Sequence, residues 1–133
     1  MIKLVFTLRR RDGMTRAEFQ RYWREQHAPL VRRNAEALRI RRYVQTHARE
    51  SELDGMIAAP RGSEPSFYDG VAELWWDSFE DIVAAMSSEA GQVAGAELLE
   101  DESRFVDLPN SPLWFGEEDV VVGAQEASTP VDD

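Results

Sequence analysis

The sequence predicts an α+β domain in which a four-stranded antiparallel sheet carries its helices on one face. Two observations support this. Apolar residues at every second position indicate strands, and apolar residues at the 3.6-residue period indicate amphipathic helices. These segments follow one another as strand, helix, strand, strand, helix, strand, which is the split βαβ or ferredoxin-like order. At 133 residues the chain has the length of one domain.

The first strand and the first helix are predicted from residues 2–9 and from the segment that starts at Thr15. Thr15 and Glu18 form a capping box, which marks the beginning of a helix. The helix then presents a stripe at helical spacing, made of Phe19, Tyr22, Trp23 and Gln26. Pro29 disfavours helical geometry at the residue before it, so the helix is expected to break around His27 and Ala28. A second helical segment is expected over residues 30–38.

The remaining elements follow the same two periods. Residues 39–48 and 68–76 are predicted strands, and Asp77 or Ser78 can cap a helix over residues 79–86. A short helix is expected over residues 90–100 and a fourth strand over residues 113–123. Residues 50–67 contain two glycines and two prolines without a period, which predicts a long loop insertion. The domain therefore spans residues 1–123, and residues 124–133 form a flexible acidic tail.

Composition restricts the classes of partner. The chain has no cysteine and two histidines, and no spacing of residues supports a metal site. Its net charge is −10, and an acidic surface repels phosphate, so no nucleic-acid partner is expected. The N-terminal apolar run is too short for a signal peptide, and no stretch approaches the roughly 18 apolar residues of a membrane span. We therefore expect a cytoplasmic protein without a membrane partner.

Charge and strand patterning predict how the chain pairs with itself. The first fifty residues contain 13 of the 15 Lys and Arg residues and only five acids, while the rest is strongly acidic. Ion pairs between the two halves are one expectation, and a solvated surface is the other. The strands carry apolar residues on both sides, so the sheet face without helices is expected to be an interface. A homodimer in which two sheets meet face to face would cover it.

Two histidines are the candidate catalytic residues. His27 lies where the first helix is expected to end, and it fits either a general acid or base in a cleft or a hydrogen bond to the last helical carbonyls. His47 shares a strand face with Tyr43 and Gln45. This polar stripe fits either a cavity, where it would orient a phenol or carbonyl, or a solvated strand end.

The other candidates are substrate-binding side chains. Tyr22, Trp23 and Trp75 could line an aromatic pocket suited to a flat polycyclic ligand, although tryptophans more often pack in a core or an interface. The hydroxyl of Tyr22 needs a partner if it is buried. Asp69 could partner a histidine of a neighbouring strand, or it could pair with the arginine-rich half.

Several of these segments resemble the EthD-domain family. The opening strand and turn, the helix TRAEFQRYWREQHAP over residues 15–29, and the strands RRYVQTH (41–47) and YDGVAELWWD (68–77) carry the resemblance, which covers residues 1–123. It implies a ferredoxin-like subunit that forms a dimeric α/β barrel, and it implies no cofactor. Relatives in that superfamily include cofactor-free monooxygenases, polyketide cyclases and muconolactone isomerases. Some fungal EthD-type proteins are associated with dehydration or decarboxylation of aromatic polyketide intermediates.

Residues and resemblance together lead to two hypotheses. The first is a cofactor-independent enzyme that acts by acid/base chemistry on a hydrophobic aromatic or polyketide-like small molecule, by dehydration, cyclisation, isomerisation or decarboxylation. A monooxygenase-like reaction stays open. The alternative is a non-catalytic binder or carrier of a hydrophobic metabolite that assists an oxygenase or a degradation pathway. That protein would need the pocket but not the histidines.

Overall fold

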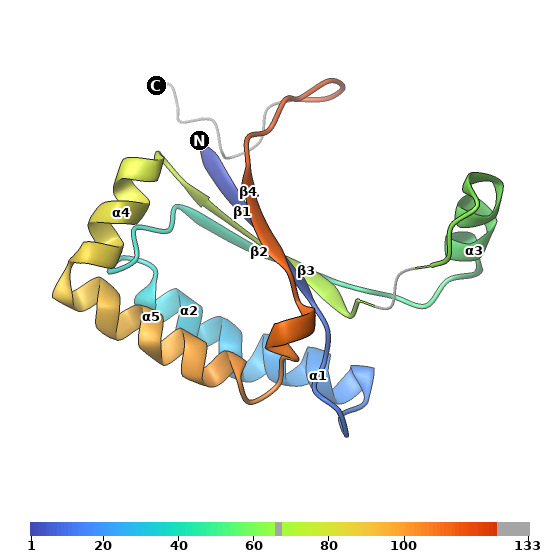
Figure 1. Cartoon of the computed structure of the whole chain (residues 1–133), viewed down its shortest axis with the longest axis horizontal. Coiled ribbons are helices and arrows are strands. Elements are labelled where there is room, and N and C mark those ends of the chain that lie inside the picture. The colour runs from blue at the N-terminus through green and yellow to red at the C-terminus, as the bar shows by residue number, and fades with distance from the viewer. Residues whose placement is uncertain (66–67, 125–133) are drawn as a thin grey trace.

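The computed structural model describes residues 1–65 and 68–124 of the chain and confirms the predicted fold class. The strands are β1 (Ile2–Leu8), β2 (Arg42–His47), β3 (Gly70–Trp76) and β4 (Leu113–Gly116), in the sheet order β2-β3-β1-β4. Every neighbouring pair is antiparallel. The helices are α1 (Arg16–Tyr22), α2 (Ala28–Asn34), α3 (Glu52–Ala58), α4 (Phe79–Ser87) and α5 (Glu89–Glu102). Figure 1 shows α1, α2, α4 and α5 on one side of the sheet and α3 standing apart.

The core lies between the sheet and this helical layer. Phe6 and Leu8 of β1 pack against Phe19 and Trp23 of the first helix and against Phe105, which follows α5. Phe19, Trp23 and Phe105 are at most 1% exposed. The buried positions in β1 alternate along the strand, because successive side chains of a strand point to opposite faces. The two-residue period predicted this face correctly.

The first helix begins as predicted but does not break at His27. The Thr15 side chain accepts a hydrogen bond from the Glu18 amide, and the Glu18 side chain caps the Thr15 amide. The predicted break is wrong, because a π-helical turn over Trp23–His27 joins α1 to α2. Its wider hydrogen bonds, such as Ala28 N–H to the Trp23 carbonyl, make room for Pro29, which lacks an N–H and crowds the preceding turn.

Two other segments differ from the prediction. The expected loop over residues 50–67 contains α3 and a 3₁₀ turn, Ala59–Arg61, and Ser51 caps α3. Short helices have too few residues to show a period, so the glycines and prolines dominated the prediction. The fourth strand ends at Gly116 and does not extend to residue 123. Gly116 pairs with Lys3, close to the start of β1, so the chain beyond it has no strand to pair with. Residues 66–67 and 125–133, which include nearly all of the expected tail, lie outside the described residues.

Ion pairs connect the basic first part of the chain with the acidic remainder, as one of the two expectations had it. Lys3 pairs with Glu73 at 3.0 Å, and Arg10 and Arg16 both pair with Asp69, at 2.6 and 2.9 Å. Further pairs are Arg39 with Asp81 and Arg41 with Asp77. These contacts lie within one subunit. They tie β1 and the first helix to β3 and help to fix the register of the fold.

The second face of the sheet has no helical layer over it (Figure 1). Its side chains combine apolar residues with ion pairs, so it is more polar than the sequence suggested. Val5, Glu73 and Val44 form one row across β1, β3 and β2, and Lys3, Trp75 and Arg42 form the next. Lys3 and Arg42 lie over the Trp75 ring. Within residues 1–65 and 68–124, none of the helices has the length and hydrophobicity needed to span a bilayer.

Candidate functional site

A small enclosed cavity of about 130 Å³ lies between the sheet and the helices. Its wall is mostly apolar, and three titratable side chains line it: His27, Tyr43 and Glu102. The apolar lining is made of Leu4, Phe6, Leu8, Trp23, Val31, Ala72, Leu74, Leu98, Phe105, Val106 and Leu113. A largely apolar space with a few convergent polar groups is typical of a small-molecule site.

His27 reaches this cavity because of the π-helical turn. An ordinary helix would continue the stripe from Phe19 and Trp23 to Gln26, which is exposed in the structure. The wider turn shifts the buried face by one residue and brings His27 onto it, where it is only 4% exposed. π-helical turns of this kind occur frequently at functional sites.

Asp101 fixes the orientation of the His27 ring. Its Oδ2 lies 2.7 Å from His27 Nδ1 in a buried contact. A carboxylate can only accept, so Nδ1 carries the proton, and in the neutral ring Nε2 keeps a free lone pair. Burial lowers the pKa of His27, although the contact with Asp101 opposes this shift. A neutral, oriented imidazole with a free lone pair can act as a general base.

Asp101 itself is held as a carboxylate by several donors. The Tyr22 hydroxyl donates to its Oδ1 at 2.7 Å, and Arg104 Nη1 donates to the same oxygen at 3.0 Å. Burial alone would raise the pKa of Asp101. The hydrogen bonds from Tyr22, His27 and Arg104 outweigh it and lower the pKa below its usual range. Tyr22 therefore finds the partner that the sequence required, and it acts on the site through Asp101.

Glu102 provides a second titratable group beside His27. Its Oε2 lies 4.0 Å from His27 Nε2, which is too long for a hydrogen bond and leaves a gap between the two atoms. Burial, with a smaller contribution from the charge of Asp101, raises the pKa of Glu102 to about 7. Near neutral pH this carboxyl group is therefore partly protonated, while its neighbour Asp101 is ionised.

Tyr43 faces the same cavity from β2. Its hydroxyl oxygen accepts hydrogen bonds from Trp23 Nε1 at 3.2 Å and from Gln45 Nε2 at 3.1 Å. In the described part of the chain, no hydrogen bond uses the hydroxyl proton of Tyr43. This proton can be donated to a ligand, and Gln45 contributes by orienting the hydroxyl. The polar stripe predicted on β2 thus faces the helical layer and not solvent.

His47 does not share the cavity with His27. Its ring packs on Trp23, with centroids 4.4 Å apart, and it lines a wider groove of about 840 Å³ near α3. Nε2 donates to Gln45 Oε1 at 2.9 Å, and Nδ1 accepts from Arg24 Nη2 at 3.4 Å. Burial and the charge of Arg24 lower the pKa of His47. Both ring nitrogens are occupied, so the structure favours a structural role for His47.

The remaining predicted residues lie around or away from the cavity. Trp23 forms part of its wall and is 1% exposed. Trp75 points to the other face of the sheet, where its Nε1 donates to Glu118 Oε1 at 3.1 Å. Asp69 is 1% exposed and accepts from the Arg10 amide, Arg10 Nη1 and Arg16 Nε. These contacts support the structural alternative for Asp69.

Sequence reasoning missed Asp101 and Glu102. Both lie in the last turn of α5, where negative charge is unfavourable because the helix dipole is negative at this end. Asp101 also follows Leu98 by three residues, which places it on the buried face of the helix. An acid on an apolar face at a helix C-terminus was therefore a usable signal. Only the fold, however, brings it to His27, 74 residues earlier in the chain.

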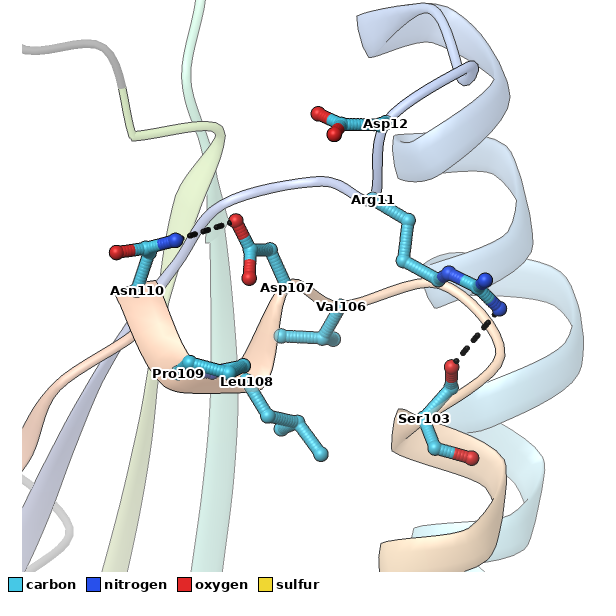
Figure 2. A pocket seen from close by; sticks show the side chains of 8 residues that line it. All are labelled: Arg11, Asp12, Ser103, Val106, Asp107, Leu108, Pro109 and Asn110. Carbon is cyan, nitrogen blue, oxygen red and sulfur yellow. Dashed lines mark hydrogen bonds between the residues drawn. The ribbon is translucent and has the colours of Figure 1, made fainter.

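A second hollow, of about 500 Å³, lies at the surface where the β1–α1 turn meets the segment after α5 (Figure 2). Its polar side chains are engaged locally. Asn110 Nδ2 donates to Asp107 Oδ2 at 2.8 Å, and Arg11 Nη1 donates to the Ser103 carbonyl at 3.2 Å. Neither histidine lines it, so the inner cavity is the better candidate site. Within the described residues, no group of three potential ligands is placed to hold a metal ion.

Comparisons with known proteins identify the family. The family model of the EthD domain matches residues 11–109. A curated relative, the conidial pigment biosynthesis dehydratase EthD of Metarhizium robertsii, is 28% identical over 118 residues, which are 87% of this chain and 81% of the relative.

Solved structures show the same fold. An EthD family protein of Bacillus halodurans superposes with a TM-score of 0.58 at 23% identity, covering 89% of this chain and 98% of the other. HapK of Hahella chejuensis gives 0.57 at 13%, covering 95% and 100%. An EthD-like protein of Ralstonia eutropha gives 0.56 at 21%, covering 92% and 94%.

Proposed function

This chain belongs to the EthD-domain family, and we propose that it is a cofactor-independent enzyme that dehydrates a hydrophobic small molecule by acid/base chemistry. The relative from Metarhizium robertsii is named a dehydratase of pigment biosynthesis, which favours dehydration among the four reactions that the sequence left open. The chemistry of the cavity supports the same choice, because dehydration requires a base for a carbon-bound proton and an acid for the departing hydroxyl.

The observation that carries this proposal is the buried His27–Asp101 pair at an apolar cavity. The pair is held at 2.7 Å, His27 lines the cavity, and within the described residues its Nε2 makes no hydrogen bond. In a largely apolar site an imidazole oriented in this way is suited to removing a proton from a bound ligand. A histidine with a purely structural role does not need a ring nitrogen that lacks a hydrogen-bond partner. His47, with both nitrogens bonded, shows the contrast.

The cavity also limits the size of the substrate. A dry protein cavity of about 150 Å³ accommodates benzene. The cavity measures about 130 Å³, close to the volume of one ring, and the polycyclic ligand that the aromatic content suggested would extend beyond it. The exposed Leu113 at its wall is the place where a larger substrate could extend outwards. We infer that a single ring of the substrate enters the site.

We also infer that the working form is a homodimer joined through the uncovered face of the sheet. Val5, Val44, Val71 and Trp114 lie on this face, and Trp114 is 52% exposed. Exposed apolar side chains on a sheet face without a covering layer favour self-association. The candidate cavity lies on the other face of the same sheet, so dimer formation would stiffen the wall that carries Tyr43.

A dehydration assay tests the proposed function. With 3-hydroxycyclohexanone as a one-ring probe, formation of cyclohexenone can be followed by its ultraviolet absorbance. His27→Gln is expected to lower the rate by about 10²–10⁴, the usual contribution of a general base. His47→Gln is the matched control and is expected to stay within a few-fold of wild type.

Equal, few-fold effects of the two substitutions would contradict the assignment of His27. If the wild-type protein binds cyclohexanone tightly but turns over no 3-hydroxycyclohexanone, and if His27→Gln binds equally well, the protein is a carrier and the enzymatic proposal is wrong.

A further inference from the structure

Glu102 has features of a functional group that the fold does not need for stability. In the described part of the chain its carboxyl group makes no hydrogen bond, and its Oε2 lies 4.0 Å from His27 Nε2. Its side chain is 22% exposed and lines the apolar cavity. A desolvated carboxyl group without hydrogen-bond partners costs folding free energy. Such a cost is typical of side chains retained for function.

The two functional atoms of the site approach the cavity from one wall. His27 belongs to the turn between α1 and α2, and Glu102 ends α5, and these helices lie in the same layer (Figure 1). Tyr43 comes from β2 in the sheet, so its free hydroxyl proton enters the cavity from the opposite layer. A ligand in the cavity therefore meets a base and a carboxyl group on one side and a hydrogen-bond donor on the other.

From this arrangement we propose that Glu102 is the general acid of the reaction and that the substrate is a one-ring β-hydroxy ketone, which loses its proton and its hydroxyl from the same face. The inference rests on the proposed function, because it assigns the acid that complements the base His27. The ketone is required because its carbonyl, bound by the Tyr43 hydroxyl, makes the neighbouring carbon-bound proton removable.

His27 Nε2 takes the proton from the carbon next to the carbonyl, and the electron pair of that C–H bond forms the new C=C bond. The bond from the adjacent carbon to the hydroxyl oxygen breaks, and its electron pair leaves with the oxygen. That oxygen takes the proton of the Glu102 carboxyl group and departs as water. Transfer of the proton from His27 to the Glu102 carboxylate, 4.0 Å away, restores both groups, directly or through the released water.

The raised pKa of Glu102, about 7, fits this role, because the carboxyl group then keeps a proton to donate near neutral pH. His27, whose pKa burial lowers, stays in the neutral form that can accept one. The short distance between the two groups sets the stereochemistry. A base and an acid only 4.0 Å apart serve neighbouring atoms on one face of a ring, which is a syn elimination.

Two reactions distinguish the role of the base, His27, from the role of the acid, Glu102. Exchange of the ring protons next to the carbonyl of cyclohexanone in D₂O needs only the base, and dehydration of 3-hydroxycyclohexanone needs both groups. Glu102→Gln keeps the shape of the side chain but cannot donate an acidic proton. It is expected to exchange deuterium within a few-fold of wild type and to lose about 10²–10⁴ in dehydration rate. His27→Gln is expected to lose both reactions.

Glu100→Gln is the matched control, because Glu100 lies one half-turn earlier on α5 with its side chain 72% exposed. It should leave both reactions unchanged, and circular dichroism verifies that all variants are folded. Dehydration by Glu102→Gln at the wild-type rate would overturn the role of Glu102 and leave the proposed function standing. A wild-type protein that catalyses neither reaction would overturn the proposed function itself.

A deuterium-labelled substrate tests separately whether the proton and the hydroxyl leave from the same face of the ring. 3-Hydroxycyclohexanone with a single deuterium on C2, placed cis to the hydroxyl, is expected to lose the label on dehydration, and the trans isomer is expected to retain it. Retention of the cis label would contradict removal of both groups from one face.

Discussion

Glu102 and Asp101 are adjacent carboxyl groups whose pKa values the fold moves in opposite directions. Asp101 accepts hydrogen bonds from Tyr22 and Arg104 and contacts His27, which lower its pKa. Glu102 has no such donors in the described structure, and burial raises its pKa to about 7. One residue of helical rotation therefore separates an orienting carboxylate from a carboxyl group that can hold a proton.

This difference predicts how stability depends on pH. The folded state keeps a proton on Glu102 that the unfolded chain releases between pH 4.5 and about 7, so this residue destabilises the fold as pH rises through that window. The full penalty is on the order of 3 kcal/mol above pH 7. Glu102→Gln is expected to increase the free energy of unfolding by about 1–3 kcal/mol at pH 8 and by much less at pH 5.

Urea unfolding of both proteins at the two pH values measures this. The lowered pKa of His27 acts in the other direction and destabilises the fold as pH falls below 6.5, in both proteins. An equal gain at both pH values would show that Glu102 is not protonated in the folded state near neutral pH.

Among the elements, the contact between the first helix and β3 keeps the two histidines in separate hollows. The Trp23 ring lies between the cavity of His27 and the groove of His47, and it packs directly on Gly70 of β3. A Cβ atom at Gly70 would lie 2.5 Å from the Trp23 ring and 2.5 Å from the Thr46 carbonyl oxygen. The missing side chain at this position lets the tryptophan approach the strand.

Gly70→Ala is therefore expected to destabilise the protein by about 1–3 kcal/mol, because neither the ring nor the backbone of β2 can move without disturbing the core. Gly95→Ala in α5 is the control. A Cβ there meets nothing within 4 Å, and the substitution should stabilise the helix by about 0.5–1 kcal/mol. Thermal unfolding of both variants measures the contrast, and a stable Gly70→Ala variant would show that Trp23 is not confined.

At the scale of the whole molecule, the sheet separates two surfaces with different roles. One side carries the helical layer and the candidate site, and the other has no such layer (Figure 1). α3 stands apart from both, without a buried residue, and Leu53, Met56 and Ile57 are each about 60% exposed or more. A chain with this distribution of apolar surface is expected to associate with a second copy.

The homodimer is testable in solution. Wild-type protein at micromolar concentration is expected to sediment as a dimer in analytical ultracentrifugation. Val71→Glu, on the uncovered face, is expected to shift it towards the monomer because the charge would be buried at the interface. Val93→Glu on α5, where the side chain is 65% exposed on the helical side, should leave the dimer intact. A monomeric wild-type protein would contradict this part of the proposal.

Much of the fold was predictable because it depends on local patterns. The capping box at Thr15 and Glu18, the alternation in β1 and the cap at Ser78 each need only neighbours in sequence. The site was predictable only in part. Of the predicted residues, His27, Tyr43 and Trp23 line the inner cavity, but the sequence could not tell that His47 lies on the other side of Trp23, since this depends on how a helix packs on a strand.

The sequence by itself determined the order of elements, the buried faces of the strands, the start of the first helix and the histidine in its HAP segment, because periodicity and capping act over a few residues. Only the tertiary structure decided that the helix continues through a π-helical turn, which moves His27 onto the buried face, and that α5 delivers Asp101 and Glu102 to it. The physical reason is that the pKa and orientation of a buried group depend on contacts between residues far apart in the chain.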